Sequence, residues 1–242
     1  MVFRAPFTPA LQPAFSQEGG VVPWYLAGGI AKANCIAAYQ PKGAASLAAS
    51  YVNLVTPGTY DAAPGTAPTF DSALGWTFDG TSQYLVQPNL GISGASPRTV
   101  AFRFTPTNVA VNRWVAIWGE NAVMKAWVIA QGVAAGNVYI YTDGKDVLTG
   151  NILSNGLDQT IIVTATGANP TTANVLVYIN GTAVSTSVAG VNPGALNTTN
   201  ANYIIGKAFG ASNYFGGNVA AMLYCNVVHP NAAALHAAMA AL

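Results

Sequence analysis

The sequence has 242 residues, of which 52% are hydrophobic and only 7% are charged. This length fits one β-sandwich or barrel domain, and a chain of this size buries a large core. The sequence contains nine basic and eight acidic residues, which gives a formal net charge of +1. Such a balance supplies no basic field for a phosphate backbone and argues against nucleic-acid binding.

The low charge predicts a surface made of Thr, Ser, Asn, Gln, Gly and Ala, because soluble domains usually carry about 25% charged residues. A weakly charged surface gives little protection against association. It suits a protein that works inside an assembly or at high local concentration on a particle.

Residues 1–30 are predicted to form an extended N-terminal arm, because four prolines exclude a continuous helix. No apolar run follows Arg4, so no secretory signal is expected, and no stretch reaches the ~18 apolar residues of a membrane span. We therefore expect synthesis in a host cytoplasm. The arm carries four apolar side chains that either fold back on the domain or dock on a neighbour: Phe3, Phe7, Leu11 and Phe15.

The domain is predicted to follow over residues 31–242. Residues 34–39 are typical of a first strand, and the Ala-rich residues 43–52 favour a short helical turn. Residues 56–75 are rich in Pro, Gly and Thr and indicate a surface loop.

From residue 76 onward the pattern is that of short strands rich in aromatic and β-branched residues. In residues 99–104, Val100, Phe102 and Phe104 alternate with polar or small residues and share one face. Asn180-Gly181 and Asp143-Gly144 are strong hairpin signals. The other predicted strands are residues 114–118, 126–130, 138–142, 161–166, 175–179 and 219–228.

The end of the chain predicts a long last strand and a short helix. Leu235, Met239 and Leu242 recur at helical spacing after the last strand. One face of the strand is expected to hold Val219, Ala221, Leu223, Cys225 and Val227. Many short strands with almost no helix indicate an antiparallel sandwich or jelly roll.

Three passages together resemble the concanavalin A-like, laminin G-like jelly roll. They are WTFDGTSQYLV at residues 76–86, VLVYINGTAV at residues 175–184, and YIIGKAFGASNYFGGNVAAMLYCNVV with the helix after it. The resemblance implies an all-β, antiparallel two-sheet jelly-roll sandwich with first and last strands adjacent, so that Cys35 and Cys225 would be neighbours. It places five apolar side chains inward: Phe78, Tyr84, Val177, Ile179 and Phe215.

The sequence also departs from that family. An acidic pair common in its closing strand is replaced by Ala220 and Ala221, and no set of calcium carboxylates can be assigned. Cys35 and Cys225 are interpreted as two free thiols or as one disulfide, and both alternatives stay open.

Candidate catalytic residues are scarce. A glycosidase needs paired carboxylates, yet the only glutamates are Glu18 and Glu120, far apart in the chain. We expect the two histidines, His229 and His236, to cap or pack. We therefore predict no enzyme activity, no catalytic residue, no metal and no cofactor.

The remaining polar and aromatic candidates have ordinary structural interpretations. Asp143 and Asp146 resemble half of a calcium loop, but turn residues are the simpler interpretation. The five tryptophans are interpreted mainly as core. Tyr214, in the loop-like GASNYFGG, is the candidate ligand-binding residue, and Phe215 beside it favours the core.

Two hypotheses for function follow. The first is a non-enzymatic structural or attachment subunit of a particle surface, namely a head-decoration or a tail- or fibre-associated subunit of a bacteriophage virion. Its partners would be other virion proteins or copies of itself. The second is a free-standing carbohydrate-binding, lectin-like module whose partner is a cell-surface glycan.

Overall fold

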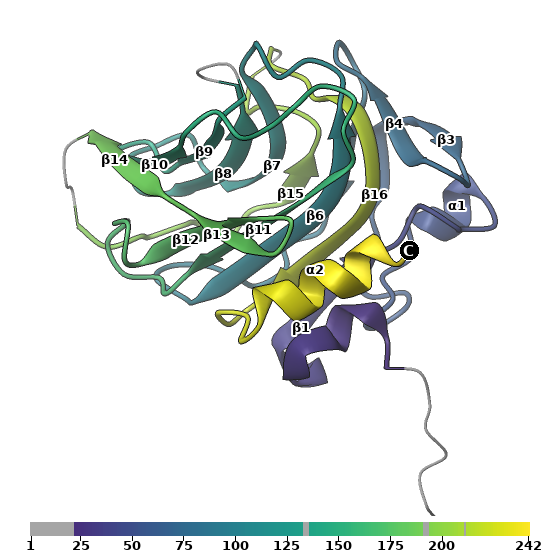
Figure 1. Ribbon diagram of the computed structural model, residues 1–242, viewed down its shortest axis with the longest axis horizontal. Helices are drawn as coiled ribbons and strands as arrows, with labels where there is room; N and C mark the ends of the chain where they lie inside the picture. Colours follow the sequence, from purple (N-terminus) through teal and green to yellow (C-terminus); the bar gives the residue numbers. More distant parts are fainter. Residues whose placement is uncertain (1–21, 133–135, 191–193, 211) are drawn as a thin grey trace, which may run out of the picture.

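The computed structural model describes residues 22–132, 136–190, 194–210 and 212–242. Two antiparallel sheets of eight strands each face one another and form a sandwich (Figure 1). The predicted jelly-roll sandwich is therefore confirmed, and so is the C-terminal helix α2, Ala232–Ala240. No helix in the described ranges is long and apolar enough to cross a membrane.

Sheet A has the strand order β13-β12-β11-β6-β16-β4-β3, and β1 also pairs with β16. The first and last strands of the fold thus lie side by side, as the resemblance implied. The strands of sheet A are β1 (Cys35–Tyr39), β3 (Thr69–Asp71), β4 (Gly75–Asp79), β6 (Arg98–Pro106), β11 (Gln159–Ala165), β12 (Val175–Ile179), β13 (Thr182–Val184) and β16 (Gly216–Cys225).

Sheet B has the strand order β14-β10-β9-β8-β7-β15-β5-β2. Its strands are β2 (Ala63–Thr66), β5 (Tyr84–Gln87), β7 (Arg113–Gly119), β8 (Ala126–Gln131), β9 (Val138–Tyr141), β10 (Lys145–Thr149), β14 (Thr186–Gly190) and β15 (Tyr203–Ile205).

The main core lies between the sheets. Val100, Phe102 and Phe104 of β6 point into it, as their alternation predicted, and each is fully buried. Phe78, Val177, Ile179 and Phe215 join the same core. Asn180 and Gly181 both have positive φ, at 49° and 78°, and close the hairpin between β12 and β13.

The outer face of sheet A is covered by helix α2 and by the 3₁₀ helix η1, Trp24–Gly29 (Figure 1). Leu235 and Met239 of α2 pack with Trp24 over Ala101 and Leu223 of the sheet. This second core explains why Ala101, on the outward face of β6, is fully buried.

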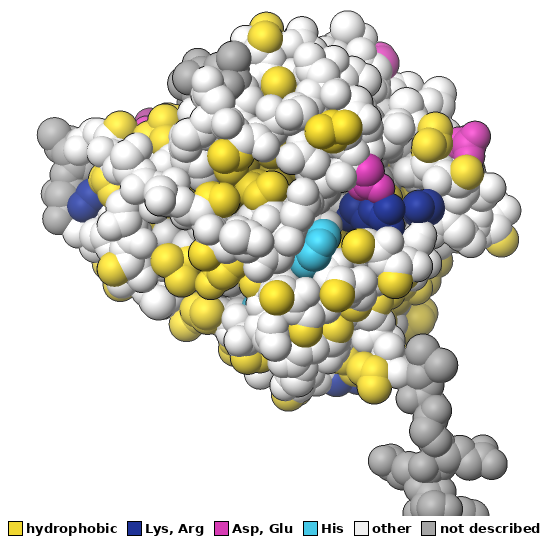
Figure 2. Space-filling view, viewed as in Figure 1, with side chains coloured by type: hydrophobic (Ala, Val, Ile, Leu, Met, Phe, Trp, Pro, Cys, Tyr) yellow, Lys and Arg dark blue, Asp and Glu magenta, His cyan; other side chains and the backbone are white. Residues whose placement is uncertain are grey.

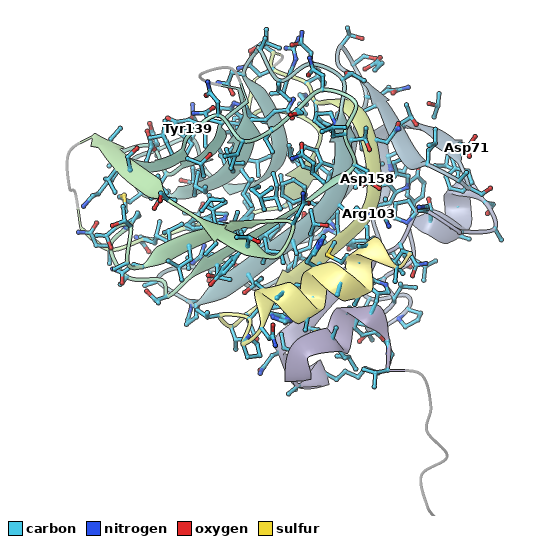
Figure 3. The ribbon with its side chains drawn as sticks, in the orientation of Figure 1. Asp71, Arg103, Tyr139 and Asp158 are labelled. Carbon is cyan, nitrogen blue, oxygen red and sulfur yellow. The ribbon has the colours of Figure 1, made fainter. Side chains whose placement is uncertain are left out.

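Arg103 of β6 links this helix to the sheet and also forms an ion pair beside it. The Arg103 guanidinium binds the carboxylate of Asp158, with an Nε–Oδ2 distance of 2.9 Å, and donates to the carbonyl of Met239 at 2.8 Å. Figure 3 shows Arg103 and Asp158 together beside α2. Charged atoms are otherwise few on the face seen in Figure 2, as the composition predicted.

Most of the predicted arm, residues 1–21, lies outside the described residues, and Phe3, Phe7, Leu11 and Phe15 lie there with it. The following segment, Trp24–Gly29, is helical, whereas extended backbone was predicted. The segment is interrupted at Ala27, whose backbone is extended, and its Trp24 and Tyr25 are buried in the core that η1 shares with α2.

Three local predictions were wrong. Residues 56–75 contain the short strands β2 and β3 in addition to loop. The last strand ends at Cys225, and its register shifts between Val219 and Ala221, so Val219 faces the main core while Ala221 faces α2. Tyr84 is half-buried on the outer face and does not point inward.

Two short helical segments complete the described structure. The 3₁₀ helix η2, Lys32–Asn34, leads directly into β1. Helix α1, Leu47–Ser50, falls within the predicted helical turn, and the Ser46 side chain caps its first turn by accepting from the amide of Ala49.

Candidate functional site

The outer face of sheet B carries a row of aromatic side chains, here called the aromatic track. It lies on the opposite side of the sandwich from α2, and Figure 3 labels one member, Tyr139, on that side. All its members are half-buried. They are Tyr139, Tyr141, Trp114, Phe209, Tyr214 and Tyr84.

Strand β9 supplies the first two rings. Its sequence, VYIY, alternates, so Val138 and Ile140 enter the core while Tyr139 and Tyr141 face outward. The two tyrosine rings lie 5.8 Å apart. This alternation was visible in the sequence and was the one signal that could have found these residues.

Trp114 reaches the track through a β-bulge. Along β7, Ala116 and Trp118 face the core, and simple alternation would send Trp114 there too. The register with β8 shifts between Trp114 and Ala116, so one extra residue turns Trp114 to the outer face. Its interpretation as core was therefore wrong, whereas Trp76, Trp118 and Trp127 are core residues.

Small side chains on β8 form the floor of the track. Ala130 lies between Trp114 on β7 and Tyr139 on β9, and Val128 lies opposite Tyr141. Because these floor residues are small, the Trp114 and Tyr141 rings lean over β8 and approach to 5.6 Å. Val128 and Ala130 are consequently almost inaccessible although they face outward.

A loop after β15 continues the track. Phe209 packs edge-on against Trp114 with ring centres 5.9 Å apart. The amide of Trp114 donates to the carbonyl of Asn213 at 3.2 Å, which places Tyr214 beside it. The candidate ligand-binding residue Tyr214 thus lies on this face, while its neighbour Phe215 is in the core.

The far end of the track holds a cation. The ammonium of Lys207 lies 4.5 Å from the ring centre of Tyr84 and 5.7 Å from that of Tyr214. The Tyr84 ring in turn lies over Gly65 of β2, where a Cβ would come within 2.1 Å of it. Within the described residues, no carboxylate forms a salt bridge with Lys207.

The near end of the track holds two carboxylates from the β9–β10 hairpin. Tyr139 donates its hydroxyl hydrogen to Asp146 at 2.6 Å, and Tyr141 donates to Asp143. Partial burial and these hydrogen bonds raise the pKa of both tyrosines, so both hydroxyls stay protonated. The carboxylates therefore fix the orientation of the rings.

The other residues singled out in the sequence have structural surroundings. His229 accepts from the amide of Asn231 at 3.2 Å, and burial lowers its pKa. Glu120 forms an exposed ion pair with Lys125 at 3.5 Å. In the part of the chain that the structure describes, no three His, Cys, Asp or Glu side chains gather as a metal site.

No family model matches the sequence, and no curated protein matches it. Solved structures do share the fold. Domain 4 of AbnA, a GH43 extracellular arabinanase from Geobacillus stearothermophilus in complex with arabinotriose, superposes with a TM-score of 0.59 at 13% identity. The match covers 85% of this chain and 98% of that domain.

Two longer proteins contain the same sandwich. The binding domain of Paraclostridial Mosquitocidal Protein 1 matches with a TM-score of 0.60 at 13% identity, over 86% of this chain and 52% of that one. The sialidase of Trypanosoma rangeli, in complex with 2,3-difluorosialic acid, matches with a TM-score of 0.60 at 14% identity, over 86% and 32%. The chain thus spans about half or less of these proteins, and the likeness shows the fold.

Proposed function

We propose that the chain is a non-catalytic glycan-binding module that holds a sugar chain along the aromatic track of sheet B. The observation that carries this proposal is the open row of half-buried rings, fixed by a bulge, a small-residue floor and two carboxylates. Rigid aromatic faces with a few polar groups beside them are typical of small-molecule sites.

The length of the track favours an extended ligand. The rings run from β9 across β8, β7 and β15 to β5, and adjacent strands are about 4.8 Å apart, so the row is about 19 Å long. This length accommodates several sugar units of a linear chain. Lys207 at one end donates hydrogen bonds, and the carboxylates of Asp143 and Asp146 at the other end accept them.

The arrangement of carboxylates supports binding without hydrolysis. Glycoside hydrolysis uses two carboxyl groups on either side of the scissile bond. Here Asp143 and Asp146 lie on one hairpin, and each already accepts a hydrogen bond from a tyrosine that it orients.

The virion hypothesis stays a prediction. It rests on the absence of an expected secretory signal, the weakly charged surface, the fold without paired catalytic carboxylates, and the apolar arm, whose Phe3, Phe7, Leu11 and Phe15 lie outside the described residues. Location on a virion surface, and partners among virion proteins or copies of the chain, remain predictions with it. The fold neighbours support the glycan hypothesis better, since domain 4 of AbnA, which is matched over 98% of its length, is solved in complex with arabinotriose.

Titration calorimetry with linear polysaccharides tests the proposal. The panel contains arabinan, xylan, galactan and polygalacturonic acid, and each titration is repeated with calcium and with EDTA. We expect binding to at least one polymer, accompanied by a shift of tryptophan emission as Trp114 is covered. The absence of binding across this panel and a broad glycan array would contradict the proposal.

We further expect Lys207→Met to weaken binding of a carboxylated polymer more than that of its neutral counterpart. A charge-assisted hydrogen bond contributes enough that affinity for polygalacturonic acid should fall about tenfold. Affinity for the same polymer after carboxyl reduction should change little. Calorimetry on both polymers measures this, with Lys32→Met, an exposed lysine in η2 beside β1, as the control. Equal losses for Lys207→Met and its control would contradict it.

A further inference from the structure

The two cysteines of the chain lie directly opposite one another. Cys35 of β1 and Cys225 of β16 are Cα partners in the antiparallel ladder, and both side chains enter the core that η1 and α2 cover. Opposite residues of such strands have Cα atoms about 4.5–5.5 Å apart. A disulfide spans Cα separations of about 4.4–6.8 Å, so this pairing is compatible with a bond, next to the register shift between Cys35 and Ala37. Both thiols are free in the structure.

The two thiols differ in access and in hydrogen bonding. Both cysteines are buried, but Cys35 is 4% exposed and lines an open cavity of about 440 Å³ with Lys32 and Tyr60, whereas Cys225 is fully buried. The Cys35 thiol donates to the carbonyl of Tyr25 at 3.4 Å. The neighbouring Cys225 thiol lowers the pKa of Cys35, whereas the Cys35 thiol and burial raise the pKa of Cys225. Cys35 is therefore the thiol that an oxidant meets first and the better nucleophile.

We propose that Cys35 and Cys225 form a reactive dithiol site that small-molecule disulfides oxidise to a cross-strand disulfide between β1 and β16. Cys35 loses its proton to solvent, and its thiolate attacks one sulfur of the reagent, forms a mixed disulfide and releases one thiolate. Cys225 loses its proton to the released thiolate, attacks the Sγ of Cys35 and expels the second thiolate, which takes up a proton. The protein loses two hydrogens and two electrons, and one reagent disulfide becomes two thiols.

The bond would fasten the strand that follows η1 and η2 to the centre of sheet A. It joins residues 35 and 225 and so encloses nearly the whole described chain. Cross-links that close long loops restrict the unfolded chain most, and we expect the thermal midpoint to rise by about 10 °C on oxidation.

The test uses the full-length chain, reduced, desalted and incubated with oxidised glutathione. Thiols are counted after denaturation, and a non-reducing peptide map locates cross-links. We expect two thiols to fall to none, one cross-link between residues 35 and 225, and no glutathione retained. Persistence of both thiols, or glutathione retained on either cysteine, would overturn the proposal.

Matched serine variants test the order of attack. Cys225→Ser should trap one glutathione on Cys35, because no second thiol resolves the mixed disulfide. Cys35→Ser should react at least about tenfold more slowly, because Cys225 is buried and its thiol pKa is raised. Equal rates would overturn the order. If a variant does not fold, the reduced wild type is treated with limiting iodoacetamide instead. We expect Cys35 to be alkylated first, and equal labelling of the two cysteines would overturn the order of attack.

Discussion

Replacing Trp114 with alanine is expected to weaken glycan binding about thirtyfold or more. Buried aromatic anchors at the centre of a binding surface commonly contribute 2 kcal/mol or more, and Trp114 is the central ring of the track. It contacts both Tyr141 and Phe209, so its loss also frees those rings to move. Calorimetry with the best polymer from the panel measures the change.

The matched control for Trp114 is Tyr178→Ala. Tyr178 is a half-buried aromatic residue on β12 that packs against the core under α2, on the other side of the sandwich. We expect the glycan affinity of the Tyr178→Ala variant to equal that of the wild type. Trp114→Phe should retain most of the binding, because a flat ring remains. If Trp114→Ala binds as tightly as Tyr178→Ala, the track is not the binding surface.

Replacing Arg98 with methionine is expected to lower the free energy of unfolding by about 3–5 kcal/mol. Arg98 is fully buried at the start of β6. Its guanidinium donates from Nη2 to the carbonyl of Gly94 at 2.7 Å, from Nε to that of Ser96 at 3.0 Å, and from Nη1 to the hydroxyl of Thr198 at 3.0 Å.

Aromatic rings hold the buried cation of Arg98. Its guanidinium lies 5.2 Å from the ring of Trp127 and 5.8 Å from that of Trp118, and no carboxylate in the described residues forms a salt bridge with it. Burial lowers its pKa to about 10, so it is protonated at neutral pH. Methionine would fill much of the space but remove all three guanidinium hydrogen bonds. The Ser96 carbonyl would lose its donor, and the Gly94 carbonyl would keep only the Thr198 hydroxyl at 3.1 Å. We expect this loss to outweigh what is gained by removing the buried charge.

Urea unfolding followed by circular dichroism measures this loss, and the thermal midpoint should fall by roughly 10 °C. Arg113→Met is the control, because Arg113 is a half-buried arginine at the start of β7 with no salt bridge within the described ranges. We expect it to change stability by less than about 1 kcal/mol. An Arg98→Met protein as stable as this control would show that the guanidinium is not a structural clamp.

Much of the fold was predictable because its signals are local. Alternation in residues 99–104 assigned the inward face of β6, and Asn180-Gly181 located a hairpin from the φ values its turn requires. Helical spacing of Leu235 and Met239 located α2. The strands β2 and β3 were missed because the proline and glycine residues in and around them indicate loop. These two strands form by pairing with β5 and β4, and the local sequence does not indicate that pairing.

The candidate site was less predictable. Tyr139 and Tyr141 were not singled out, although the alternation of β9 could have indicated their outward direction. Tyr214 was singled out from its loop. Trp114 was assigned to the core from its place in a strand. This assignment failed because a one-residue bulge reverses the alternation of side chains there, and no sequence signal indicates that bulge. The contact between Lys207 and Tyr84 could not be predicted, because Lys207 lies in the loop after β15 and Tyr84 lies on β5. Only the tertiary fold brings them together.

The sequence by itself determined an all-β sandwich, the positions of most strands and turns, and the juxtaposition of Cys35 with Cys225, which the resemblance implied. The alternation of side chains within a strand and the backbone preferences of turn residues are short-range effects. They can therefore be predicted from the local sequence. Only the tertiary structure decided which outer face is covered. Among the described residues, α2 and η1 cover sheet A, whereas no helix covers the half-buried aromatic track of sheet B. Packing between distant segments decides what the outer face of a strand contacts.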